Sequence, residues 1–107
     1  MKMSPFQLAE LTLIRSQNFN FFNGQHIWDS LMAHRDLWKA VKTYDHDVDV
    51  QLRELAAGRH HFDTLYILPK KGHEEELEAL AKTWHADEIN WIHSKGIDTQ
   101  VLRVWWD

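Results

Sequence analysis

Apolar residues recur with helical spacing in four segments of the chain, and β-favouring residues cluster in others. The clearest start signal is Ser4 followed by Pro5, a capping residue ahead of a proline suited to the first helical position. The clearest stop signal is Gly58, which follows a segment with an acidic first turn. The predicted helices cover residues 5–16, a segment beginning near Gln25, residues 47–57 and the glutamate-rich residues 70–84.

Three segments are typical of β-strands. Residues 62–69 are rich in β-favouring side chains and end at a proline. Residues 87–94 and 99–107 flank a short link that contains Gly96, and so short a link implies an antiparallel hairpin. Residues 37–44 fit either a helix or a strand, because periodicity alone does not assign a short apolar segment, and we favour a strand.

The order of these elements predicts a single α+β domain over residues 1–107. We expect a mixed sheet of three or four strands, with the C-terminal antiparallel hairpin, packed with three to four helices. The sheet is expected to be mixed because a helix joins strand 62–69 to strand 87–94, and such a crossover makes two strands parallel.

Apolar side chains point to both faces of this predicted sheet. In the strand at residues 62–69 both sets of alternating positions are apolar. A sheet with one solvated face alternates apolar and polar residues, so we expect both faces to be covered at least in part. The cover comes from the chain's own helices on opposite sides or from a second copy of the protein. In the last strand, Leu102, Val104 and Trp106 alternate with Val101, Arg103 and Trp105.

Six tryptophans in 107 residues are a high load. They either all belong to the core, or one or two form a homodimer patch or a ligand pocket, since tryptophan is enriched at interfaces. Trp105 with Arg103 is the first candidate for such a surface, and Trp91 with His93 on the preceding strand is the second. We expect a homodimer, because symmetric pairs are the commonest assemblies.

Composition excludes several classes of protein. The chain has no cysteine, which excludes disulfides, thiolate zinc sites and cysteine nucleophiles. Its net charge is −4 and no basic stripe is visible, so neither nucleic acid nor a membrane surface is expected as a partner. No apolar run is long enough to span a membrane, and the N-terminus lacks the features of a signal peptide. We therefore expect a cytoplasmic protein.

Candidate chemistry is sparse. The chain has no nucleophile elbow, glycine-rich phosphate loop or HExxH motif. His46 precedes the helix at residues 47–57 and His60 follows it, so the rod of about 16 Å between them prevents both from binding one ion. We predict no resident metal or cofactor. The remaining polar candidates lie at two places in the sequence, and they are His60, His61 and Asp63, and then His85, Asp87 and Glu88.

These observations favour a small non-enzymatic binding protein, either a homodimer or an accessory or inhibitory partner of another macromolecule. The alternative is a small metal- or histidine-assisted enzyme with a cleft near His85, Asp87 and Glu88.

Overall fold

The computed structural model describes residues 3–43, 48–59, 62–93, 95–96 and 99–107. In chain order its elements are α1 (Pro5–Ser16), β1 (Asn18–Phe19), β2 (Phe22–Asn23), α2 (Gly24–Ala33), the 3-10 turn η1 (Arg35–Leu37), β3 (Trp38–Thr43), α3 (Val48–Ala56), β4 (Thr64–Pro69), α4 (Glu74–Ala81), the 3-10 turn η2 (Lys82–Trp84), β5 (Glu88–His93) and β6 (Gln100–Trp105). The α+β class, the four predicted helices and the C-terminal hairpin are confirmed. The ambiguous segment before residue 44 forms the strand that we favoured.

Local signals explain where the first two helices begin. The Ser4 side chain accepts a hydrogen bond from the Gln7 main-chain N–H, and Pro5 occupies the first turn of α1. The Asn23 side chain caps α2 in the same way. Gly24, the first residue of α2, packs so closely on the end of α1 that a Cβ there would overlap the main-chain oxygen of Ile14. Glycine is therefore required at this junction.

The main sheet has the strand order β3-β4-β6-β5. Its three pairs of neighbouring strands are all antiparallel, so the prediction of a mixed sheet is wrong. Strands β4 and β5 do run in the same direction, since both are antiparallel to β6. However, β6 returns from the hairpin into the position between them, so they share no ladder. The predicted helical connection from β4 through α4 to β5 is present, but β4 and β5 are not adjacent in the sheet.

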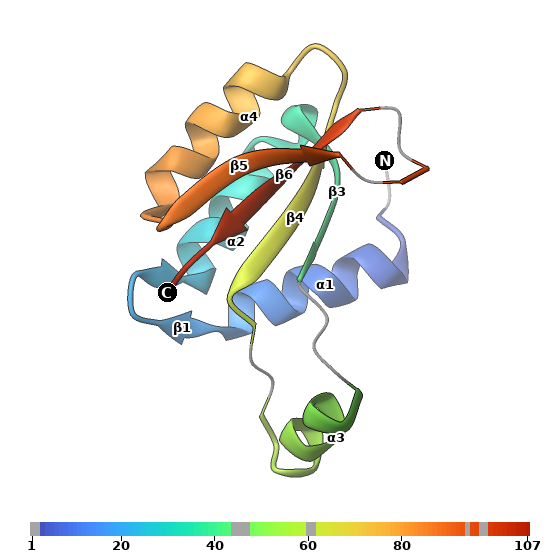
Figure 1. Cartoon of the computed structure of the whole chain (residues 1–107), viewed down its shortest axis with the longest axis vertical. Helices are drawn as coiled ribbons and strands as arrows, with labels where there is room; N and C mark the ends of the chain where they lie inside the picture. Colours follow the sequence, from blue (N-terminus) through green and yellow to red (C-terminus); the bar gives the residue numbers. More distant parts are fainter. Residues whose placement is uncertain (1–2, 44–47, 60–61, 94, 97–98) are drawn as a thin grey trace.

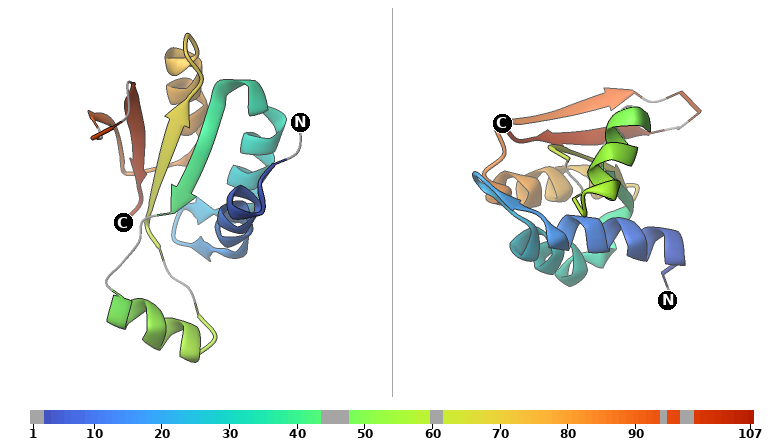
Figure 2. Two further views of the ribbon diagram at one scale, coloured as in Figure 1. Left: turned by 90° about the vertical axis from the view of Figure 1, so that its right-hand side faces the viewer. Right: turned by 90° about the horizontal axis from the view of Figure 1, so that it is seen from below.

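Helices α1, α2 and α4 all lie on one side of this sheet (Figures 1 and 2). The core forms between these helices and the inner face of the sheet. From the sheet it includes Val41, Leu65, Ile67, Leu102 and Val104, and from the helices Leu11, Ile14, Ile27, Leu31 and Leu77, all buried. Of the two covers that the sequence suggested for the sheet, helices on opposite faces are not seen in the described part of the chain.

Helix α3 stands apart from this core. It lies in the connection between β3 and β4 and projects from one end of the molecule (Figure 2, left). Leu52 and Leu55 are 61% and 59% exposed. Among the described residues, no helix is long and apolar enough to serve as a membrane span.

Candidate functional site

The face of the sheet opposite the helices presents a continuous surface of side chains from all four strands. The cross-strand register aligns them in three rows, because residues paired across antiparallel strands point to the same face. We call this surface the outer face. Its first row is Ala40, Leu68, Val101 and Ile92, its second is Lys42, Tyr66, Arg103 and Asn90, and its third is Thr64, Trp105 and Glu88.

The first row is apolar. Val101 is buried even though no helix covers it in the described part of the chain, and Ile92 lies directly opposite it. Leu68 and Ile92 are partly buried. An apolar row on the uncovered side of a sheet departs from the polar pattern expected for a solvated face. The parts of Leu68 and Ile92 that remain exposed are therefore apolar surface on the side of the sheet that the described helices do not cover.

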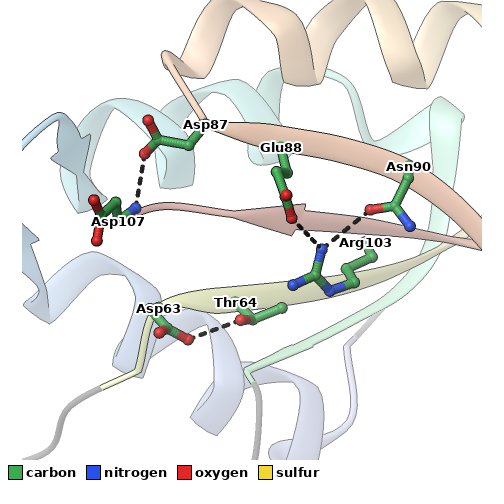
Figure 3. Close-up of polar contacts among 7 residues, drawn as sticks. All are labelled: Asp63, Thr64, Asp87, Glu88, Asn90, Arg103 and Asp107. Atoms are coloured by element: carbon green, nitrogen blue, oxygen red, sulfur yellow. Dashed lines mark hydrogen bonds and ion pairs between the residues drawn. The ribbon is translucent and has the colours of Figure 1, made fainter.

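Arg103 occupies the centre of the second row. Its Nη1 donates to Glu88 Oε2 at 3.1 Å and to Asn90 Oδ1 at 3.1 Å (Figure 3). The Arg103 side chain is 26% exposed and that of Glu88 is 59% exposed. The two contacts thus hold the guanidinium in place, and its other N–H donors, on Nη2 and Nε, make no hydrogen bond in the described part of the chain.

Trp105 lies beside Arg103 in the third row, between Thr64 and Glu88. It is partly exposed. The other five of the six tryptophans are buried in the core or packed against it, namely Trp28, Trp38, Trp84, Trp91 and Trp106. The expectation that all six tryptophans belong to the core is therefore wrong for Trp105, which is partly exposed on the outer face.

The second pair of interface candidates lies elsewhere. Trp91 faces α4, where its Nε1 donates to Glu78 Oε1 at 2.6 Å. That hydrogen bond, with the nearby ammonium of Lys82, holds the pKa of the Glu78 carboxyl below its ordinary value. His93 is exposed at the end of β5. The sequence placed all four candidates in one group, but Trp91 lies on the opposite face of the sheet from Trp105 and Arg103.

The acidic candidates form hydrogen bonds that hold strand ends and side chains in place. Asp87 Oδ2 accepts the main-chain N–H of Asp107 at 2.7 Å, and Asp63 Oδ1 accepts the Thr64 hydroxyl at 2.8 Å (Figure 3). Glu88 is paired with Arg103.

Of the three histidines among these polar candidates, only His85 lies in the described part of the chain. His85 is exposed and has a left-handed backbone conformation, with φ of 58°. His60 and His61 lie outside the described residues. In the described part of the chain, no three His, Asp or Glu side chains are grouped so that they could hold a metal ion. The enzyme cleft near His85, Asp87 and Glu88 stays a prediction.

Sequence reasoning identified Trp105 and Arg103 but missed most of the surface around them. Tyr66, Leu68, Ile92 and Val101 complete it. The apolar alternation on both faces of strand 62–69 was the available signal. It could not show that the helices cover only one of those faces.

Protein-family models, curated proteins and solved structures were each compared with this chain, and none of them matches it. The function is therefore inferred from the outer face itself.

Proposed function

We propose that this protein is a non-enzymatic binding protein that associates with another protein through the outer face of its sheet and that also forms a homodimer. The observation that carries the proposal is the juxtaposition of Tyr66, Arg103 and Trp105 on a face of the sheet that no helix covers in the described part of the chain. Tryptophan, tyrosine and arginine are the residue types that dominate the energetics of protein interfaces.

The chemistry of the surface favours a protein partner. The apolar row supplies area that gains from removal from water, and Arg103 beside it supplies directed hydrogen bonds. A partner that fits would place an apolar side chain against Leu68 and Ile92 and a carboxylate or main-chain carbonyl against the guanidinium. The chain's net charge of −4 disfavours a polyanion such as nucleic acid. The chain has no cysteine and needs no oxidising compartment to fold, and we place this binding in the cytoplasm.

The β-sheet framework suits this role. Residues on paired strands are held by main-chain ladders on both sides, so Arg103 and Trp105 on the inner strand β6 lose little freedom on binding. Glu88 and Asn90 further restrict the Arg103 rotamer. An accessory or inhibitory partner needs such a preorganised surface and no catalytic group.

The test compares three variants as bait in cells of the source organism, with cross-linking and mass spectrometry as the readout. Arg103→Ala and Trp105→Ala are expected to lose the same captured protein, and binding of that purified protein should then weaken roughly tenfold or more for each variant. Phe21→Ala is the matched control, because Phe21 is 73% exposed but lies outside the outer face. Equal capture by all three variants would refute the proposal, provided that each retains the wild-type melting temperature.

A further inference from the structure

The two edges of the sheet differ in how their main-chain groups are satisfied. At the β3 edge, the Gln7 side chain from α1 takes the place of a neighbouring strand. Its Nε2 donates to the Val41 carbonyl at 2.8 Å, and its Oε1 accepts the Val41 N–H at 3.1 Å. Glu10 Oε1 accepts the Thr43 N–H at 2.7 Å and the Thr43 hydroxyl at 3.1 Å. Helix α1 therefore closes this edge against another strand.

The β5 edge has no such cover in the described part of the chain. The main chain of Glu88–His93 forms its hydrogen bonds with β6. On the edge that points away from β6, no side chain from another described element forms a hydrogen bond with it. Its sequence EINWIH holds no proline or lysine, two residues with which natural edge strands block pairing, and Glu88 at its start is its only acidic or basic residue besides His93. Among the described residues, therefore, nothing pairs with this edge along the six residues of β5.

The side chains along β5 are apolar toward both faces. Ile89 and Trp91 point to the inner face, Ile92 points to the outer face, and all three are only partly buried. Their neighbours on β6, Leu102 and Val104, are fully buried. A further strand beside β5 would cover Ile89, Trp91 and Ile92, in the same way that β5 covers Leu102 and Val104 on β6.

The charges along β5 select the identity and direction of that strand. The carboxylates of Asp87 and Glu88 lie at its start, whereas the ammonium of Lys95 lies in the turn just beyond its end. Two copies of β5 in antiparallel alignment bring each acidic end beside the basic end of the other copy. Parallel alignment would bring like charges together. Glu88 can contribute although it is paired with Arg103, because its side chain remains largely exposed.

We propose that β5 pairs with β5 of a second copy in antiparallel orientation about a two-fold axis. This inference rests on the self-association part of the proposed function and names its interface. The two four-stranded sheets would then become one continuous sheet, and the two outer faces would form one extended surface with two Trp105–Arg103 pairs. Such a dimer would be suited to a partner that is itself two-fold symmetric or elongated.

Cysteine cross-linking tests the geometry directly, because the natural chain contains no cysteine. Asn90 lies in the middle of β5 and is exposed, so antiparallel pairing brings its two copies within about 8 Å of each other. We expect Asn90→Cys to cross-link efficiently to a dimer with a short bis-maleimide. Ala40→Cys is the matched control, an exposed outer-face position on the closed β3 edge, and it should not cross-link with itself or with Asn90→Cys.

Charge reversal and hydrogen exchange provide the second measurement. The double change His93→Glu and Lys95→Glu places like charges at both ends of the pairing and should raise the dimer Kd at least about tenfold. Lys39→Glu, an exposed position on β3, should leave it unchanged. Main-chain amides of residues 88–93 should become more protected from exchange as protein concentration rises.

The outcomes separate this inference from the proposed function. A dimer that is lost in Trp105→Ala, but is unaffected by the double charge reversal and unprotected at β5, would refute edge pairing and leave the homodimer in place. A monomer by light scattering at high protein concentration would refute both the homodimer and the edge pairing. The binding of another protein through Arg103 and Trp105 is tested separately, by the capture experiment with Arg103→Ala and Trp105→Ala.

Discussion

Replacing Gln7 with alanine is the most direct test of how the β3 edge is closed. Gln7 joins α1 to Val41, a residue 34 positions away in the sequence, through two hydrogen bonds in a partly buried setting. The variant leaves one main-chain donor and one acceptor without their partners. It keeps α1 intact, because alanine is a strong helix former.

The magnitude follows from those two bonds. A typical hydrogen bond contributes about 1 kcal/mol to the free energy of unfolding, so losing both costs about 2 kcal/mol. The better helix propensity of alanine returns about 0.4 kcal/mol, and water reaching Val41 recovers part of the remainder. We therefore expect Gln7→Ala to lower the free energy of unfolding by about 1–2 kcal/mol, and the melting temperature by about 4–12 °C for a domain of this size.

The assay is urea unfolding followed by tryptophan fluorescence, with light scattering on the folded protein. Gln25→Ala is the matched control, since Gln25 forms only exposed side-chain hydrogen bonds with Arg15 and Asp29 and should change stability by less than about 0.5 kcal/mol. Because Gln7→Ala also uncovers a second sheet edge, the variant should form species larger than those of the wild type. Wild-type stability together with unchanged scattering would refute the view that Gln7 substitutes for a strand.

Two further predictions concern the inner side of the sheet. The pKa of Glu78 is lowered in the folded state, mainly by the hydrogen bond from Trp91. Ionised Glu78 therefore stabilises the folded state above the unfolded pKa of about 4.3, and this stabilisation is lost as pH falls through the folded pKa. Glu78→Gln should therefore show a smaller loss of unfolding free energy between pH 5 and pH 3 than the wild type in urea titrations, and equal losses would contradict this assignment. Trp106 is buried against Phe22, with ring centroids 4.7 Å apart, and its Nε1 donates to a main-chain carbonyl at 3.0 Å. Trp106→Ala should cost about 3–5 kcal/mol or prevent folding, as measured by circular dichroism, whereas a loss below about 1 kcal/mol would show that this packing is not part of the core.

Much of the secondary structure could be predicted because its signals are local. The Ser4 cap, the glutamates that begin α4 and the short link around Gly96 each act within a few residues. The period of two along the last strand also placed Trp105 and Arg103 on the same face correctly. The closed β3 edge was not predicted, since Gln7 and Glu10 read only as polar positions of a surface helix.

The arrangement of these elements needed contacts that no local pattern encodes. The sequence correctly related β4 to β5 through α4, but it could not show that β6 would insert between them and make the sheet antiparallel throughout its described junctions. The apolar spacing of Leu52 and Leu55 is typical of a helix packed on a core, yet both remain exposed on α3.

The sequence by itself determined the α+β class, the positions of most elements and the face to which each strand residue points, because these depend on near-neighbour sterics, capping and periodicity. Only the tertiary structure decided which face the helices cover and which edge stays open. Those features arise from the packing of α1, α2 and α4 on one side of the sheet and from hydrogen bonds between residues far apart in the chain. The proposals rest on the face that no described helix covers and on the edge of β5 that no described strand pairs with, and both are consequences of that packing.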